Sequence, residues 1–297
     1  MPYDLSQLRA FLCVVEAGTI GRAARELHMS QPALSRAIKR LEDTVGEHLF
    51  ERHTTGMRLT TFGAALVPHA RVLNYEEEAA REKINAMRGL ATGALRVGTT
   101  SSTSALMLPK ILSSFSQRWP AIRIDAIEGV RDQLTVALTN YDVDLILAAD
   151  AADSADVVSL KECRWTENIS VVVGASHPLR HECKGLTLEQ IRSERWGMVP
   201  EGTEPHERLT QLFTAQGMEP PKMMVSTTSI QLLKSMVVHA NLVSWLTTPM
   251  YEAERLAQQI YPLDVPGLSE TRSFTVFRRR NGVLPSPASR LVDEIQT

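Results

Sequence analysis

Hydrophobic residues recur at helical spacing in three short segments at the start of the chain. The first segment carries an apolar face made of Leu5, Leu8, Phe11, Leu12 and Val15. Gly18 is expected to end this helix, and Thr19 is expected to cap a second helix of about two turns. Ser30 can cap a third helix with Pro32 in its first turn, where the missing N–H costs nothing. The pattern therefore predicts three helices, the last two joined by a short connection.

The third predicted helix separates apolar from polar positions. Its buried face is expected to consist of Leu34, Ala37, Ile38 and Leu41. Its first turns offer Gln31, Ser35 and Arg36 for hydrogen bonds to base edges or phosphates. A short helix, a turn and a polar, basic second helix are typical of the helix-turn-helix motif, whose second helix enters the major groove of DNA.

Two short segments after the third helix alternate apolar and polar residues. Residues 49–52 and 57–60 are typical of two strands around Thr54-Thr55-Gly56, which predicts a small wing. Arg52 and Arg58 suit contact with the backbone or the minor groove of DNA. The alternative is an ordinary helical subdomain whose bases form a solvated face. The first sixty residues carry eight basic and seven acidic residues, so net charge alone does not predict DNA binding.

Residues 8–66 resemble the DNA-binding domain of the LysR-type transcriptional regulators. The resemblance rests on Leu8, Phe11, Val15, Glu16, Gly18, Ala23-Ala24, Leu27, Ser30-Gln31-Pro32-Ala33-Leu34-Ser35, Ile38, Leu41-Glu42, Gly46, Leu49-Phe50, Arg52, Leu59-Thr60, Gly63 and Leu66. It implies a winged helix-turn-helix that binds double-stranded operator DNA. The DNA-binding residues that it implies are Ser30, Gln31, Pro32, Ala33, Ser35, Arg36, Lys39, Arg52 and Arg58. The family often shows further arginines between Arg52 and Leu59, so we expect fewer phosphate contacts from this wing.

A heptad pattern follows the wing. With Thr61 as the N-cap, residues 61–90 predict one long helix that carries Pro68 in its early turns. Its a and d positions are Leu59, Gly63, Leu66, Ala70, Leu73, Glu77, Ala80, Ile84 and Met87. Because a narrow apolar seam requires a partner helix, the pattern predicts a helix–helix contact, and the resemblance implies that the partner is the same helix of a second copy, in a homodimer. The resemblance implies an antiparallel contact; the alternative is packing of this helix against the C-terminal domain of its own chain.

Short apolar strands alternate with helices beyond a hinge at residues 89–93, which predicts an α/β fold with parallel strands. The expected strands are residues 95–98, 122–127, 143–148, 169–173, 196–199, 222–225, 242–246 and 274–278. The expected helices are residues 103–117, 187–192, 207–216, 230–238 and 287–295, with one further helix around Leu134. The phrases GALRVG and GASHPL resemble the two-lobed, periplasmic-binding-protein-like effector domain of the LysR-type regulators.

The chain is accordingly expected to hold three domains. They are a winged helix-turn-helix at residues 1–60, a linker helix at 61–90 and an effector-binding domain at 91–297. Within the last domain, lobe 1 is expected at about 94–163 plus 268–297 and lobe 2 at about 164–267, with crossings near 163–168 and 263–268. In such a fold a ligand lies between the lobes at the carboxyl ends of the strands.

Hydroxyl-bearing residues form an unbroken run from Thr99 to Ser104, directly after the first strand of that domain. Together with the N–H groups of the following helix, they can orient donors at an anion. The resemblance adds the other cleft loops, so the expected effector-binding residues are Thr100, Ser101, Ser102, Thr103, Arg131, Thr203 and Thr228. Arg131 is the nearby base that can pair a carboxylate, so we expect a small carboxylate or an aromatic acid. The alternative is plain helix capping by these hydroxyls.

The composition agrees with a soluble globular protein. The chain has 297 residues, of which 43% are apolar and 22% are charged. No window reaches the roughly 18 consecutive apolar residues of a membrane span, and no signal peptide is recognisable, which predicts a cytoplasmic protein. Cys13, Cys163 and Cys183 show no CxxC spacing, which fits reduced thiols, with Cys13 in a core.

Catalysis is the first competing function class, and no GxSxG, P-loop or HExxH motif supports it. The eight histidines lack metal-ligand spacing, so the sequence predicts no enzyme, no metal and no cofactor. A thiol-sensing regulator would need a reactive pair in the second lobe, for which Cys163 and Cys183 are the candidates. The preferred prediction is a transcriptional activator or repressor that binds a DNA operator and a small effector. It is expected to form a homotetramer from two dimers and to contact RNA polymerase.

Overall fold

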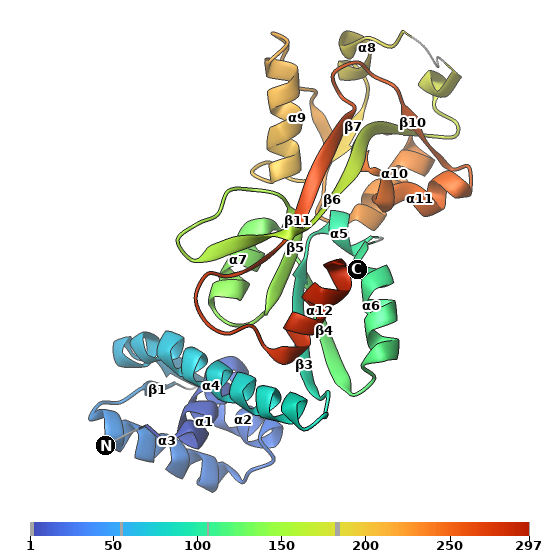
Figure 1. The fold of residues 1–297 in the computed structure, drawn as a ribbon. Coiled ribbons are helices and arrows are strands. Elements are labelled where there is room, and N and C mark those ends of the chain that lie inside the picture. The colour runs from blue at the N-terminus through green and yellow to red at the C-terminus, as the bar shows by residue number, and fades with distance from the viewer. Residues whose placement is uncertain (1–2, 54–55, 106, 182–184, 297) are drawn as a thin grey trace.

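The computed structural model describes residues 3–53, 56–105, 107–181 and 185–296. Figure 1 shows a small helical unit at one end of the molecule, a long helix beside it, and an elongated pair of lobes at the other end. None of the helices within the described ranges combines the length and the apolar character that a membrane crossing requires.

The N-terminal unit consists of α1 (Leu5–Ala17), α2 (Ile20–Glu26), α3 (Gln31–Val45), β1 (Phe50–His53) and β2 (Gly56–Leu59). Asp4, Thr19 and Ser30 each accept a backbone N–H at the start of one helix. The predicted helices and wing strands are therefore confirmed. Thr54 and Thr55, at the tip of the predicted wing, lie outside the described residues.

The long helix α4 (Thr61–Met87) follows the wing as a single helix of 27 residues, as predicted. The expected N-cap at Thr61 is wrong by one residue. Thr60 caps the helix instead, because its Oγ1 accepts the Gly63 N–H at 3.0 Å. Pro68 lies inside α4 without ending it.

One core joins the N-terminal unit to the start of α4. It contains Leu8, Phe11, Leu34, Ile38, Leu41, Leu49, Phe50, Leu66 and Ala70. Gly63 packs so closely that a Cβ there would lie 2.2 Å from the Leu49 carbonyl oxygen. The first part of the predicted heptad seam is thus buried within its own chain, and only the later part remains exposed.

The C-terminal part is the predicted two-lobed α/β unit. The first lobe contains β3 (Gly93–Thr99), α5 (Ser101–Ser104), α6 (Met107–Arg118), β4 (Ile122–Glu128), α7 (Arg131–Thr139), β5 (Leu145–Ala149) and α12 (Ser286–Gln296). The second lobe contains a 3-10 helix (Pro178–His181), α8 (Leu188–Arg192), β7 (Trp196–Met198), α9 (Glu204–Thr214), β8 (Met223–Ser226), α10 (Ile230–Ala240), β9 (Ser244–Thr247), α11 (Thr248–Leu256) and β10 (Ile260–Leu263). Two long strands, β6 (Val157–Gly174) and β11 (Glu270–Arg279), run through both lobes (Figure 1).

Seven strands form one sheet in the order β10-β6-β11-β5-β3-β4, with β9 also paired to β6. β3 is parallel to β4 and β5, whereas β11 is antiparallel to β5 and β6. The sequence predicts a crossing between the lobes near residues 163–168, and β6 passes through this region as one continuous strand of 18 residues. Its pairing with β11 satisfies backbone groups across the crossing, so the lobes are joined by hydrogen-bonded strands rather than by loops.

The elements differ from the prediction at two further places. The helix expected at residues 103–117 is divided into α5 and α6, and Leu106, expected inside it, lies outside the described residues. The Thr103 hydroxyl donates to the Leu147 carbonyl at 2.9 Å, which holds α5 at the end of the sheet. The sequence pattern does not predict α11 or β10, although Pro249 in the first turn of α11 is a helix-start signal.

Each lobe has its own hydrophobic core. The first core includes Leu95, Val97, Phe115, Leu145, Leu147 and Val276, and the second includes Ile169, Val171, Trp196, Phe213 and Trp245. The space between the lobes is filled by neither core. Thr100, Gly129 and Asp150 line that space, which places the carboxyl ends of β3, β4 and β5 at its edge.

Candidate nucleic-acid interface and effector cleft

The outward side of α3 carries the predicted DNA-contacting residues. Leu34, Ile38 and Leu41 are buried beneath the helix and anchor it to the core. On the other side Ser30, Gln31, Pro32, Arg36 and Lys39 are exposed, and Ala33 and Ser35 are partly exposed. The cap and the first turns of α3 therefore form a continuous exposed surface on a rigidly seated helix.

Basic side chains beside this surface are not neutralised within the chain. Four exposed bases form no ion pair with a carboxylate in the described ranges: Arg36, Lys39, Arg40 and Arg58. Glu42, also on α3, turns towards the wing, where it accepts the Leu49 N–H at 2.8 Å. Unpaired cations on an exposed helix suit a polyanionic partner.

The wing is seated on the turn between α1 and α2. β1 and β2 pair antiparallel, with Glu51 opposite Arg58. The Gly18 carbonyl accepts the Met57 N–H at 2.9 Å, which ties the second wing strand to that turn. Arg58 is exposed on the wing. The Arg52 side chain lies outside the part of the chain that the structure describes.

A cleft of about 580 Å³ lies between the two lobes. Its walls are the segments that follow β3, β4 and β5 in the first lobe and the starts of α9 and α10 in the second. Six of the seven predicted effector-binding residues line it: Thr100, Ser101, Ser102, Arg131, Thr203 and Thr228. Both lobes thus contribute polar groups to one concave space, which is the usual form of a small-ligand site.

Thr103 lies outside this cleft, and its expected role as an effector contact is corrected. Its side chain is buried, at 1% exposure. Its hydroxyl donates to the Leu147 carbonyl at 2.9 Å and accepts the Thr100 N–H at 3.2 Å, as part of a capping box. For Thr103 the alternative of plain helix capping is therefore the right one.

Part of the hydroxyl run is engaged with a carboxylate of its own chain. Ser101 and Ser104 donate their hydroxyls to Glu128 at 2.6 and 2.7 Å. Because these two donors are already satisfied, the run is not a ready site for an external anion. Ser102 is different: it is 9% exposed, and its hydroxyl forms no hydrogen bond with any described residue.

Arg131 lies on the first-lobe wall of the cleft, as expected, but it is partly committed there. Its guanidinium donates to the Ala149 carbonyl at 2.7 Å and lies 4.2 Å from the centre of the Phe277 ring. Burial lowers the pKa of Arg131 from its ordinary value. The guanidinium therefore braces the end of β5 as well as facing the cleft.

A second arginine, Arg272 of β11, also lines the cleft, and the sequence pattern does not predict this. The residue is 9% exposed, and its guanidinium forms an ion pair with Glu204 at the start of α9. The signal that could have revealed it is the alternation along β11. Arg272 stands two residues before the buried Phe274 and so shares its face, where an unpaired charge is rare.

Two family profiles match the chain. The LysR substrate binding domain matches residues 88–297, and the bacterial regulatory helix-turn-helix protein of the lysR family matches residues 5–64. The chain belongs to the LysR family of transcriptional regulators. The predicted winged helix-turn-helix, the effector-binding domain and the role as a DNA-binding regulator rather than an enzyme are thereby confirmed.

Known transcriptional regulators are similar to this LysR-type regulator over nearly its whole length. The transcriptional regulator CfxR of Cupriavidus necator is 31% identical over 285 residues, covering 96% of this chain and 88% of the relative. The transcriptional regulator YdcI of Escherichia coli K12 is 27% identical over 296 residues, covering 98% and 94%.

Solved structures share the fold of the LysR-type regulator. A full-length OxyR variant of Pseudomonas aeruginosa has a TM-score of 0.75 at 22% identity, covering 100% of this chain and 94% of that one. Full-length CbnR in complex with its target DNA has a TM-score of 0.69 at 21% identity, covering 99% of both chains. At these identities the likeness shows a common architecture.

Cys13 and Cys163, the two cysteines that the structure describes, are both free thiols. Cys163 lies in the core of the first lobe rather than in the second, at 1% exposure. Burial raises its pKa, which keeps the thiol protonated. Burial and then Glu26 raise the pKa of Cys13 to about 11. Cys183 lies outside the described residues.

Proposed function

We propose that this LysR-type regulator binds a double-stranded DNA operator through α3 and the wing. The proposed contacts are Ser30, Gln31, Pro32, Ala33, Ser35, Arg36, Lys39, Arg52 and Arg58. The start of α3 carries this proposal. There Gln31, Ser35 and Arg36 lie on the side opposite the buried apolar face, next to cations without an ion-pair partner in the described ranges. These three side chains can bond base edges, while the remaining bases hold phosphates and set the orientation.

We further propose that two copies associate through α4, the linker at residues 61–90. Large apolar side chains are exposed along it at Phe62, Leu73, Ile84 and Met87, by 50%, 42%, 51% and 81%. Their spacings of eleven and three residues keep them on one stripe of the helix. On another face, Tyr75 is buried against Tyr141 and Arg279 of the first lobe. The alternative contact with its own effector domain therefore coexists with a stripe that suits a second, antiparallel copy.

The effector-binding domain, residues 91–297, would then bias the arrangement of four chains. A small carboxylate or aromatic acid between the lobes changes the angle between them and hence the spacing of the paired DNA-binding units. Such a ligand needs only to favour one arrangement by a few kcal/mol. Altered spacing bends the operator differently and changes the contact with RNA polymerase.

Selection from a random duplex library, followed by affinity measurement, tests the DNA assignment. Each lost bidentate base contact costs about 1–3 kcal/mol. The double variant Ser35→Ala, Arg36→Ala should therefore bind the selected DNA sequence about 10- to 100-fold more weakly. Affinity for unrelated duplexes should fall much less, because phosphate contacts remain. Arg123→Ala, which removes an exposed base of β4 far from α3 along the chain, is the matched control. Unchanged specific affinity in the double variant would overturn the proposal.

A further inference from the structure

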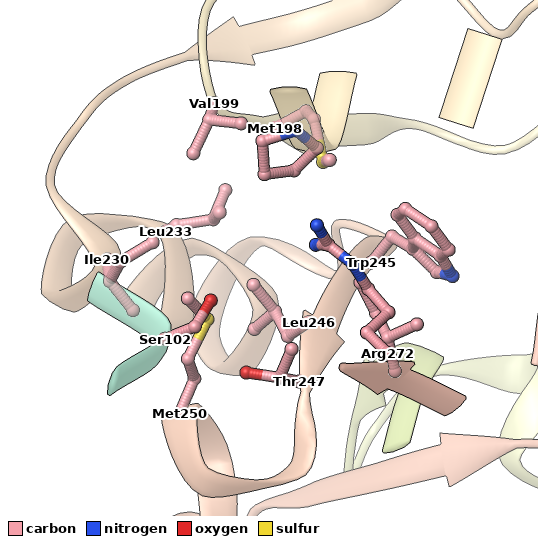
Figure 2. Close-up of a pocket in the computed structure, with 12 residues that line it drawn as sticks. Ser102, Met198, Val199, Ile230, Leu233, Trp245, Leu246, Thr247, Met250 and Arg272 are labelled. Carbon is pink, nitrogen blue, oxygen red and sulfur yellow. The ribbon is translucent and has the colours of Figure 1, made fainter. Parts of the chain in front are cut away.

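A small pocket of about 20 Å³ lies at the inner end of the cleft. The two spaces share the lining residues Ser102, Val199, Pro205, Ile230, Met250 and Arg272. Figure 2 shows the guanidinium end of Arg272 and the hydroxyl of Ser102 facing the same space. The surrounding walls are apolar, formed by Ile169, Met198, Leu233, Trp245 and Leu246. The pocket thus combines one cation with hydrocarbon walls.

Two hydroxyls that line this pocket, those of Ser102 and Thr247, have no hydrogen-bond partner among the described residues. Thr247 is 1% exposed, and its buried Oγ1 has no hydrogen-bond partner among the described residues. It occupies the N-cap position of α11 without making the cap hydrogen bond. A buried hydroxyl without a partner is destabilising, so this one is suited to a hydrogen bond with a group from outside the chain. The free Ser102 hydroxyl lies on the same side of the pocket in Figure 2.

The ion pair of Arg272 is unequal in exposure. The Arg272 side chain is 8% exposed, whereas the Glu204 side chain is 49% exposed. Glu204 is the hydrogen-bond partner that the structure gives this guanidinium within the described ranges, although a guanidinium has several N–H groups to offer. Water can therefore solvate the Glu204 carboxylate once the pair opens, whereas Arg272 stays buried and needs another anion in its place.

We propose that an effector carboxylate binds Arg272 by displacing Glu204, with Ser102 and Thr247 as its hydroxyl partners. Exchange is favoured over simple addition because five carboxylates and two arginines line the cleft, so a further negative charge would be repelled. The apolar walls select an acid with a short hydrocarbon body. This inference rests on the proposed function, because it names the ligand class of the same effector cleft.

Chemical rescue tests the exchange in the full-length chain. Glu204→Ala leaves Arg272 without its carboxylate, and propionate carries the carboxylate and the methylene that the substitution removes, with one further methyl group for the apolar wall. Propionate should raise the melting temperature of Glu204→Ala and bind it at least about tenfold more tightly than it binds wild type, as measured by calorimetry. Propionamide, which has the same shape without the charge, should do neither.

Glu207→Ala is the matched control, because Glu207 lines the cleft on the same helix and forms no ion pair with the described residues. It removes the same charge from the cleft, so general electrostatics would act equally in both variants. The proposal is overturned if propionate affinity rises equally in Glu207→Ala, or if the gain survives in the double variant Glu204→Ala, Arg272→Gln. Circular dichroism of that double variant confirms that it folds.

DNA selection with the same wild-type preparation separates the two proposals. Rescue by propionate without a selected DNA sequence would refute the proposed function and leave the Arg272 site standing. A selected operator without rescue would refute the carboxylate exchange and leave DNA binding standing. Thr247→Val should reduce propionate affinity for Glu204→Ala about threefold or more if the free hydroxyl contacts the acid.

Discussion

The cations of α3 and those of the effector cleft differ in their exposure to solvent and in whether groups of the chain already bind them. Arg36 and Lys39 are exposed and form no ion pair with any described carboxylate. In the cleft, Arg272 is buried against Glu204, and Arg131 donates to the Ala149 carbonyl at 2.7 Å. The surface of α3 therefore presents unpaired positive charge, whereas the arginines of the cleft are bonded to groups of their own chain.

This difference matches two kinds of ligand. A polyanion releases many counterions and needs no local exchange, so unpaired surface cations bind it strongly and with a steep dependence on salt. A small acid carries one charge, and it can hold a buried arginine only by replacing the carboxylate already there. A ligand can therefore bind Arg272 in the cleft only when Glu204, at the start of α9, moves away.

The largest expected difference concerns salt. Operator affinity of the dimer should fall about 10³-fold or more between 50 and 200 mM potassium chloride, as for six or more phosphate contacts. Propionate affinity for Glu204→Ala should change less than about threefold, because the buried arginine is poorly screened. Lys39→Ala should lower the slope of log affinity against log salt by about 2 per dimer. Equal salt dependence at both sites, measured by fluorescence anisotropy and calorimetry, would remove the distinction.

Ser102 and Thr103 are neighbouring hydroxyl residues, of which Ser102 lines the cleft and Thr103 is buried beside it. Thr103→Val removes bonds to Leu147 and Thr100, so it should lower the free energy of unfolding by about 1–3 kcal/mol. Ser102→Ala removes a hydroxyl without a described partner, so it should change stability by less than about 0.5 kcal/mol. Urea denaturation measures both values.

Ligand binding should separate the same two variants in the opposite sense. In the Glu204→Ala background, Ser102→Ala should weaken propionate binding, whereas Thr103→Val should leave it within about twofold. If Thr103→Val weakens propionate binding as strongly as Ser102→Ala does, the assignment of Thr103 as a structural residue is wrong.

The N-terminal unit could be predicted closely because its signals are local. Thr19 and Ser30 cap helices whose first apolar positions lie only a few residues later in the sequence. Each of the two side chains accepts the backbone N–H of the residue three positions later. The predicted N-cap of the linker helix is wrong by one residue, Thr60 rather than Thr61, because two adjacent threonines could cap the helix equally well. Local chemistry therefore determines the N-terminal unit and the linker helix.

The cleft could be predicted only in part because its remaining contacts are distant in sequence. The hydroxyl run and the loop at Arg131 are local signals, and they do reach the cleft. The pair of Arg272 with Glu204 joins residues 68 apart, and the continuity of β6 depends on its register with β11. Nothing near Thr247 in the sequence shows that its hydroxyl is left without a partner. Such features follow from topology rather than from spacing.

A third group of cations is paired across domains rather than within one. Glu78 of α4 contacts Arg9 of α1 at 3.3 Å and Arg96 of β3 at 2.8 Å. Burial lowers the pKa of Arg96, but the hydrogen bond with Glu78 and the charge of Asp144 raise it overall. This carboxylate therefore links the DNA-binding unit, the linker helix and the first lobe.

The smallest expected effect tests that link. Glu78→Gln should lower the free energy of unfolding by roughly 1 kcal/mol, because it leaves the half-buried Arg96 with Asp144 at 4.0 Å and with Glu82 as its remaining counter-charges. Glu77→Gln, at the neighbouring position, breaks only an exposed pair with Arg81 one turn away and should cost about 0.3–0.5 kcal/mol. Urea midpoints of the two variants decide between them. If Glu77→Gln costs as much as Glu78→Gln, the pairing between domains adds nothing beyond ordinary surface charge, and only the cleft arginines remain distinct from the free cations of α3.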